Sequence, residues 1–212
     1  MIIAVDGPAA SGKGTLARRL ATKYGLSHLD TGRTYRAVAA ALLAAGKPAE
    51  DEAAALGFAR DADFSRLDDP ALGDPAVGEM ASRIAVNPAL REFLVERQRE
   101  FAAVAMSARG GAVLDGRDIG TVVCPDAPLK LYIVASVEER ARRRALEAYG
   151  VADGPGYDAM LSALQARDAR DMAREASPLR PAADAHHIDT TKMSPDGVLE
   201  LVARLVENIR NR

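Results

Sequence analysis

A glycine-rich segment with a single lysine follows the first apolar run of the chain. The segment is Gly7-Pro8-Ala9-Ala10-Ser11-Gly12-Lys13-Gly14-Thr15, and the apolar run occupies residues 2–5. The spacing Gly-x4-Gly-Lys is typical of a phosphate-binding loop, whose glycines bring backbone N–H groups against a polyphosphate. Lys13 adds a charge between the β- and γ-phosphates, and the N-terminus of the next helix faces the same anion. A simple turn would explain Gly7 and Gly12 but not Lys13.

The residues after Lys13 narrow the class of nucleotide-binding protein. Most phosphate-binding loops place Ser or Thr directly after the lysine to hold magnesium, but here Gly14 stands there and Thr15 follows. This ending favours a nucleoside monophosphate kinase over a GTPase. The string closest to the Asn-Lys-x-Asp of a GTPase, at 191–194, lacks the carboxylate that would bind guanine. We therefore expect residues 7–15 to bind ATP.

A carboxylate ends another buried run. Asp115 follows the apolar residues 112–114 and precedes Gly116-Arg117-Asp118. A carboxylate at the carboxyl end of a strand beside a phosphate loop can hold a magnesium-bound water, as in the Walker-B arrangement. Asp-Gly is also common in ordinary turns, but the adjoining Arg117-Asp118 favours a functional interpretation. We expect Asp115 to bind the metal through water and Thr15 to place its hydroxyl on the metal side.

Two arginine-bearing segments could bind further phosphates. Arg36 closes the segment 30–36, at the edge where a doubly wound sheet keeps its ligand crevice, and could bind an acceptor phosphate bidentately. In the second segment, residues three and four apart share one helix face; they are Arg167, Arg170, Asp171 and Arg174. Both patterns also occur on solvated surfaces. Beside a phosphate loop, the second segment is typical of an arginine-bearing lid that neutralises charge and excludes water.

Alternating strand and helix patterns predict an α/β fold with a parallel five-stranded sheet flanked by helices. The strands are expected at 2–5, 26–29, 112–114, 129–134 and 186–189. Helices are expected at 14–24, from 32 to about 45, from Asn87-Pro88, from a capping box at Ser136, at 157–175 and from Ser194-Pro195. The helix after Asn87 should bury Leu90, Phe93, Leu94, Phe101 and Val104.

One domain with two attachments accounts for the chain. Its core is predicted at 1–36, 87–150 and 182–212, with an insert at about 37–86 and a lid at about 151–181. The part of the insert at about 48–86 is expected to form short helices. The 212 residues carry a formal net charge of −2, which gives no reason to expect nucleic acid or anionic membranes as partners. The single cysteine, Cys124, excludes an intramolecular disulfide and is expected to be a small buried hydrophobe. With neither a leader nor an apolar span expected, we predict a cytoplasmic monomer.

The chain resembles the bacterial cytidylate kinases over nearly its whole length. The resemblance rests on 7–15, 30–36, 82–101, Asp-Gly-Arg-Asp-Ile-Gly-Thr-Val-Val at 115–123, the segment 167–174 that begins with Arg-Asp-Ala-Arg-Asp, and Pro-Ala-Ala-Asp at 181–184. Adenylate kinases carry Gly-Phe-Pro-Arg at the corresponding strand end. The resemblance implies a P-loop NTPase-type fold with a nucleoside-monophosphate-binding insert, and transfer of phosphate from ATP, with Mg²⁺, to CMP or dCMP.

The resemblance also implies roles for individual residues. Arg36 and Arg117 correspond to the arginines that hold the CMP phosphate, and Thr31 lies near them. The group that reads cytosine corresponds to Ser82, Arg91 and Asp118, and the lid contacts to sugar and phosphates correspond to Arg167, Asp171 and Arg174. Two segments depart from the family: Leu72-Gly73-Asp74 lacks a basic residue, and Arg33-Thr34 replaces small or apolar residues.

The chemistry of the residues agrees with this resemblance. Cytosine offers an amine donor that a carboxylate such as Asp118 can bind, whereas uracil places a carbonyl there. The acceptor is already an anion, so no side-chain base is expected. Stabilisation of the transferring phosphoryl group is expected from Lys13, Arg117, Arg167 and Arg174.

The sequence leaves other functions open. A kinase of the same fold could act on UMP, AMP or shikimate, and a nucleotide-binding switch could share the phosphate loop. A switch would not need Arg36, Arg91, Arg117 and Asp118.

Overall fold

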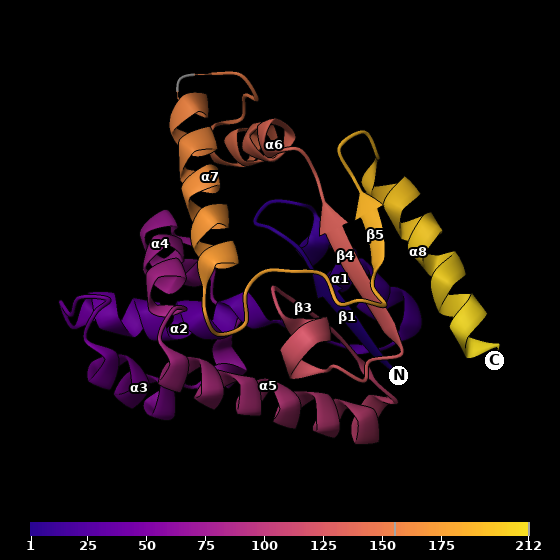
Figure 1. Ribbon diagram of the computed structural model, residues 1–212, viewed down its shortest axis with the longest axis horizontal. Coiled ribbons are helices and arrows are strands. Elements are labelled where there is room, and N and C mark those ends of the chain that lie inside the picture. The colour runs from indigo at the N-terminus through magenta and orange to yellow at the C-terminus, as the bar shows by residue number, and fades with distance from the viewer. Residues whose placement is uncertain (155, 212) are drawn as a thin grey trace.

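The central sheet of the computed structural model, which describes residues 1–154 and 156–211, has five parallel strands in the order β2-β3-β1-β4-β5. The strands are β1 (Ile2–Asp6), β2 (Ser27–Asp30), β3 (Ala112–Gly116), β4 (Leu129–Val134) and β5 (His186–Asp189). Because all of them run in one direction, their carboxyl ends form one edge of the sheet (Figure 1). The predicted α/β fold is confirmed.

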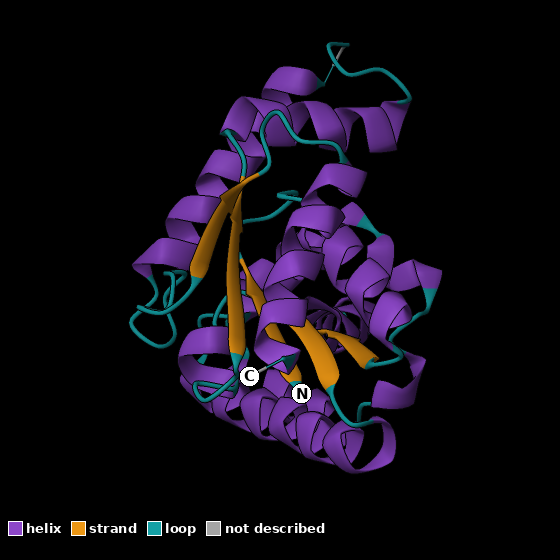
Figure 2. Cartoon of the chain, turned by 90° about the vertical axis from the view of Figure 1, so that its right-hand side faces the viewer, coloured by secondary structure: helices purple, strands orange, loops and turns teal. Residues whose placement is uncertain are grey.

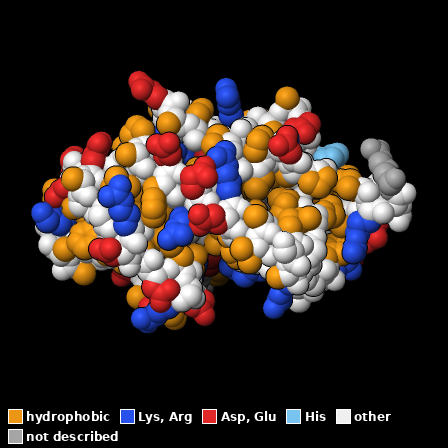
Figure 3. Space-filling model, turned by 90° about the horizontal axis from the view of Figure 1, so that it is seen from below, with side chains coloured by type: hydrophobic (Ala, Val, Ile, Leu, Met, Phe, Trp, Pro, Cys, Tyr) orange, Lys and Arg blue, Asp and Glu red, His pale blue; other side chains and the backbone are white. Residues whose placement is uncertain are grey.

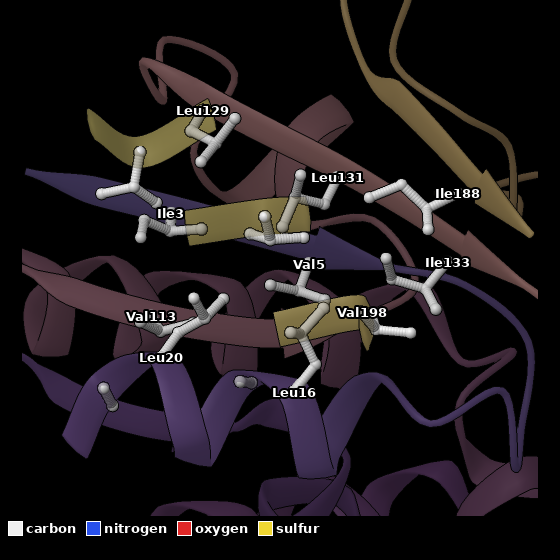
Figure 4. Close-up of a cluster of buried hydrophobic side chains, with 14 residues drawn as sticks. Ile3, Val5, Leu16, Leu20, Val113, Leu129, Leu131, Ile133, Ile188 and Val198 are labelled. Atoms are coloured by element: carbon white, nitrogen blue, oxygen red, sulfur yellow. The ribbon is translucent and has the colours of Figure 1, made fainter. Parts of the chain in front are cut away.

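One face of the sheet is covered by α1 (Lys13–Tyr24) and α8 (Pro195–Arg210). Alternate residues of each strand point to this face, as in any strand, so Ile3 and Val5 pack here and Ala4 packs on the opposite face. Figure 4 shows Leu16 and Leu20 of α1 below the strand residues. The core on this face therefore fixes the start of α1, which carries the end of the phosphate loop.

The opposite face is covered by α5 (Pro88–Arg109) and by the π-helical turn η3 (Ile119–Val123). Asn87 caps α5 by accepting the N–H of Leu90, as its position before Pro88 predicts. The predicted core stripe is wrong at its end, because Val104 is 67% exposed on the face that α5 turns to solvent. Acidic and basic side chains are mixed on the molecular face shown in Figure 3. The sequence analysis did not predict η3.

A second apolar cluster lies beside the sheet and joins the helices between β2 and α5. These elements are α2 (Thr31–Ala44), α3 (Glu52–Asp61), η1 (Phe64–Arg66), η2 (Pro70–Gly73) and α4 (Pro75–Ile84). The expectation of short helices at 48–86 is confirmed. The cluster includes Tyr35 and Leu42 from α2, Ile84 from α4, and Leu90 and Leu94 from α5, so these helices share a core with the start of α5.

Two helices stand beyond the carboxyl ends of the strands: α6 (Val137–Tyr149) and α7 (Tyr157–Ala173) (Figures 1 and 2). Ser136 caps α6 by accepting the N–H of Glu139, but Glu139 bonds Arg143, so only one half of the predicted capping box forms. The helix expected at 157–175 ends earlier, because Arg174 already has an extended backbone. Cys124 is half-buried, and none of the described helices has the length and hydropathy to cross a bilayer.

Replacing Gly7, in the turn between β1 and α1, should destabilise the protein more than replacing Gly25, which follows the end of α1. A Cβ on Gly7 would lie 2.1 Å from the carbonyl oxygen of Ile133, whereas one on Gly25 meets nothing within 4 Å. Both glycines have positive φ, so Gly25→Ala should lower the free energy of unfolding by about 1–2 kcal/mol through backbone strain. Gly7→Ala should lower it substantially more, and denaturant unfolding of both variants measures this. Equal losses would contradict the packing of the loop against β4.

Candidate active site

The phosphate-binding loop runs from the end of β1 into the first turn of α1, where the sequence places it. Gly7 has φ 151° and Gly12 has φ 90°, backbone conformations that favour glycine. Ala10 adopts φ 59°, a strained value for a residue with a side chain. Such conformations let a loop present its backbone N–H groups to a bound phosphate.

Lys13 is buried in this loop. Its Nζ donates to the carbonyl oxygen of Pro8 at 3.2 Å. Burial, together with the nearby positive charge of Arg117, lowers the pKa of the Lys13 ammonium to about 7. An ammonium in such surroundings is stabilised by an added anion, so the loop is arranged to receive a phosphate.

Carboxylates gather on the other side of the loop. The side chain of Asp115 is buried, and its Oδ2 lies 3.5 Å from the position that a Cβ on Gly14 would occupy. Burial, and then the charge of Asp115, raise the pKa of Asp30. Oxygen donors with unbalanced negative charge fit Mg²⁺, which prefers one or two carboxylates and retained waters. The side chain of Thr15, at the start of α1, is exposed toward solvent.

No group of three or more His, Cys, Asp or Glu side chains able to hold a metal is found in residues 1–154 and 156–211. The donors that fit a magnesium ion here would be completed by water and by the phosphates of the nucleotide. Asp115 is itself oriented by its neighbours, since His28 Nε2 lies 2.8 Å from its Oδ1. Thr31 donates its hydroxyl to the carbonyl oxygen of Asp115 at 2.8 Å.

A cluster of arginines faces the loop from β3 and α7. Arg117 Nε donates to Asp171 Oδ2 at 2.8 Å, and Arg174 NH1 lies 3.7 Å from Asp171 Oδ1. Burial, with the charge of Arg117, lowers the pKa of Arg167 to about 10. The Nε of Arg167 and one terminal nitrogen of Arg174 are buried with no hydrogen-bond partner. Donors aimed inward and left unpaired are the feature expected of an anion site.

A second polar group lies beyond Arg117. Arg91 of α5 donates to Asp118 Oδ2 at 2.5 Å and to the carbonyl oxygen of Ala85 at 3.0 Å, and both members of the ion pair are buried. Ser82 is also buried, and its Oγ accepts from Arg170 Nε at 3.3 Å. The structure brings these three candidate base-reading residues to the same side of the sheet edge, although they come from α4, α5 and the end of β3.

Arg36 points into the insert in this structure. It donates to the carbonyl oxygens of Leu72 at 2.6 Å and Asp74 at 3.4 Å. Arg33 makes similar bonds to the carbonyl oxygens of Leu67 and Asp69. Arg36 thus holds the backbone of one departure from the family pattern, Leu72-Gly73-Asp74, whereas Arg33, which belongs to the other, holds the backbone between η1 and η2.

Several residues at this edge were missed by the sequence analysis. Arg140 of α6 donates to Asp168 Oδ2 at 2.6 Å and to the carbonyl oxygen of Ala9 at 3.2 Å, which links α7 to the phosphate loop. Asp6 binds two backbone N–H groups of η3. The sequence shows a run of arginines at 140–144, but such a run does not reveal which of its side chains is buried. His28, which orients Asp115, had no sequence signal.

A cavity of about 630 Å³ opens between the end of α7 and the turn that joins α4 to α5. Its lining consists of Val86, Pro88, Arg170, Ala173, Arg174, Glu175 and Ala176. Because Arg174 lies both in this lining and in the arginine cluster, the cavity adjoins the region of Arg91 and Asp118.

The fold and the site together define a P-loop phosphotransferase architecture: a phosphate-binding loop follows a central parallel strand, and arginines from other elements face it. The family model described as cytidylate kinase matches residues 3–208 of the chain. The chain belongs to the cytidylate kinase family.

Curated relatives agree with this assignment. The chain is 53% identical over 206 residues to the cytidylate kinase of Rhizobium meliloti, covering 97% of this chain and 95% of that one. It is 54% identical over 207 residues to the cytidylate kinase of Brucella ovis, covering 98% and 93%.

Solved structures share the fold at low identity. An uncharacterized protein from Eubacterium ventriosum aligns with a TM-score of 0.55 at 13% identity, covering 98% of each chain. A sugar kinase from Janibacter aligns with a TM-score of 0.53 at 15% identity, covering 97% of this chain and 94% of that one. At these identities the likeness concerns the fold alone.

The Asp171 ion pairs predict a pH-dependent stability. Burial raises the pKa of this carboxyl, but Arg117, Arg174 and Arg167 outweigh burial, and the net pKa lies below its usual value of 3.8. The stabilisation is therefore present above about pH 4 and lost as the pH falls further. Asp171→Asn should lower the free energy of unfolding by about 3 kcal/mol at neutral pH, because it leaves buried arginines without their anion.

The difference between Asp171→Asn and the parent protein should shrink below about pH 4, where the parent carboxyl is itself protonated. Denaturant unfolding at several pH values measures this, with Asp153→Asn as control. Asp153 pairs with Arg142 at an exposed site, so its loss should change the stability little. A pH-independent difference for Asp171→Asn would contradict the charge argument.

Proposed function

We propose that this protein transfers the γ-phosphoryl group of ATP to the phosphate of CMP, the reaction that its family name describes. The observation that carries the proposal is the buried Arg91–Asp118 pair, whose carboxylate directly follows Arg117 in the sequence. Such an arrangement offers a donor site and a base-reading acceptor site at one sheet edge. A nucleotide switch would have no use for the second site.

The chain is proposed to work as three parts. The core comprises 1–36, 87–150 and 182–212, the nucleoside-monophosphate-binding insert about 37–86, and the lid about 151–181. The apolar cluster that joins α2, α3 and α4, and that includes Leu90 and Leu94 of α5, supports an insert that is packed within itself and anchored to the core. Exposed contacts between α7 and α4, such as Arg170 with Glu79 at 2.7 Å, support a lid that can leave the insert.

The acceptor phosphate is proposed to lie between Arg36 and Arg117, with Thr31 near it. Arg36 is held by backbone carbonyls, which accept more weakly than a phosphate dianion, so a phosphate can recruit it. From α7 and its end, Arg167, Asp171 and Arg174 would contact sugar and phosphates. The unpaired donors of Arg167 and Arg174 support this role.

Asp118 is proposed to read the base. Its carboxylate accepts from Arg91 and can accept a second hydrogen bond from the exocyclic amine of cytosine. Uracil would place a carbonyl acceptor against the same carboxylate, which leaves both groups unpaired. Ser82 and Arg91 complete the group, and dCMP would satisfy it equally because the sugar hydroxyl is not part of the base edge.

The ATP phosphates are proposed to bind all the residues of the loop at 7–15, with Lys13 beside the transferring group. Magnesium, when bound near Thr15 and Asp115, would neutralise charge on the phosphates. Since the acceptor is an anion, the protein needs no general base. Its own contribution is to hold the two phosphates in line and stabilise the developing charge with Lys13 and the arginines. A cytoplasmic monomer is the proposed form.

Replacing Lys13 tests the donor site. Lys13→Ala should leave the fold intact, because the side chain makes one 3.2 Å bond to Pro8, and should lower kcat on the order of 10²-fold or more. A coupled assay of ADP formation measures kcat, and Lys23→Ala, at the other end of α1, is the matched control. A near-normal kcat in folded Lys13→Ala would contradict the assignment of Lys13 to the donor site.

Replacing Asp118 tests base reading. Asp118→Asn presents an amide that can donate to a uracil carbonyl but weakens the bond to the cytosine amine. A charge-assisted bond is worth ~1.5–3 kcal/mol, so the CMP/UMP ratio of kcat/KM should fall roughly ten- to a hundredfold. The same assay with CMP, dCMP, UMP and AMP gives the ratio and separates this activity from other nucleotide kinases. An unchanged ratio in the folded variant would place base reading elsewhere.

A further inference from the structure

Asp6 is a buried carboxylate for which the proposed mechanism has no use. It is the last residue of β1, directly before the phosphate loop, and is 4% exposed. One oxygen accepts the N–H of Ile119 and the other accepts the N–H of Gly120, both at 2.8 Å. Burial raises the pKa of Asp6 to about 7, against the opposing effect of these two N–H groups. Both oxygens are thus committed to the backbone of η3.

The turn that Asp6 binds also packs against Lys130 of β4. A Cβ on Gly120 would lie 3.2 Å from Lys130 Cδ and 3.4 Å from Asp6 Oδ2, so a side chain here would require a shift of a few tenths of an ångström in the turn or in Lys130. The ammonium of Lys130 extends past the turn to Asp184, at 2.9 Å and 3.0 Å from its two oxygens. The backbone at 119–120 therefore contacts both the Asp6 carboxylate of β1 and the aliphatic part of the Lys130 side chain of β4.

The position of this turn determines the position of Asp118. Asp118 directly precedes Ile119, and its own carbonyl oxygen accepts the N–H groups of Val122 and Val123 at 2.8 Å and 3.1 Å. A displacement of η3 would therefore displace Asp118 relative to Arg91. Along the chain, Asp6 is followed directly by Gly7, the first residue of the phosphate loop. One carboxylate thus joins the donor loop to the base-reading turn.

We propose that Asp6 is a positioning residue for base recognition: its two hydrogen bonds to η3 fix Asp118 relative to the phosphate-binding loop. This inference rests on the proposed function, in which Asp118 reads cytosine. Asp6 touches no nucleotide and acts through the backbone of Ile119 and Gly120. Its loss should therefore impair recognition of the acceptor base more than binding of ATP.

Asp6→Asn tests the inference. The asparagine offers one oxygen acceptor, and its NH₂ group faces the second N–H, so one of the two bonds is replaced by a repulsive contact. KM for CMP should rise and the CMP/UMP ratio of kcat/KM should fall, each roughly tenfold, because small misplacements of a recognition group have large kinetic effects. KM for ATP should change less than about twofold. A purely structural role would lower the melting temperature and leave this split absent.

Two further variants keep the outcome decisive. Asp51→Asn is the matched control, since Asp51 also accepts a backbone N–H, that of Ala54, but lies at the start of α3; its kinetics should match those of the parent. Gly120→Ala keeps Asp6 and displaces the turn, and should lower the CMP/UMP ratio in the same direction. If Asp6→Asn does not fold, Gly120→Ala alone decides the question.

The result that would overturn the inference is an unchanged CMP/UMP ratio in folded Asp6→Asn, or in Gly120→Ala where Asp6→Asn does not fold. Equal effects on the KM values for CMP and ATP would overturn it as well. Asp118→Asn, measured in parallel, separates this failure from that of the proposed function. An unchanged CMP/UMP ratio in Asp118→Asn would contradict both base reading by Asp118 and positioning by Asp6. A changed ratio in Asp118→Asn with an unchanged ratio in Asp6→Asn would contradict only the positioning role of Asp6.

Discussion

Burial of several cations at the carboxyl edge of the sheet is the constraint on which the rest of the site depends. Burial and the charge of Arg117 lower the pKa values of both Lys13 and Arg167. Asp171 supplies a counter-charge to Arg117 and Arg174, but Arg167 and Arg174 still carry unpaired buried donors. An anion bound among these groups would accept hydrogen bonds from the unpaired donors and would favour the charged form of Lys13.

The second requirement is that elements far apart in sequence hold this edge in register. Parallel pairing aligns Asp6 with Gly116 and Asp30 with Asp115, so β1, β2 and β3 end at one level. Hydrogen bonds from buried side chains to backbone then connect the loops beyond the strands. Arg140 ties the phosphate loop to α7, and Asp6 ties its entry to η3. Such bonds are directional, so they set positions that apolar packing alone would leave free.

The sequence predicted the parts of the molecule whose signals are local. Phosphate-loop spacing, the caps at Asn87 and Ser194 and the apolar runs of the strands each depend on neighbouring residues, and the elements formed as expected. Partners remote in sequence were not predictable in the same way. Arg140 and Asp168 are 28 residues apart, and Asp6 and Ile119 are 113 apart. The exposed Val104 was misjudged because helical periodicity identifies a face but not the length over which another layer covers it.

The two classes of ion pair on α7 differ in how firmly they hold the helix, and this bears on how a lid would move. Arg170 and Glu79 have side chains 33% and 53% exposed, so water can replace their contact at little cost. Arg117 and Asp171 are 15% and 5% exposed, and separating them leaves charges poorly solvated. Opening of α7 would therefore be limited by this inner pair and by the Arg140–Asp168 pair, whose side chains are 6% and 12% exposed. A phosphate that competes with Asp171 for Arg117 would weaken one of these two restraints on a lid built on α7.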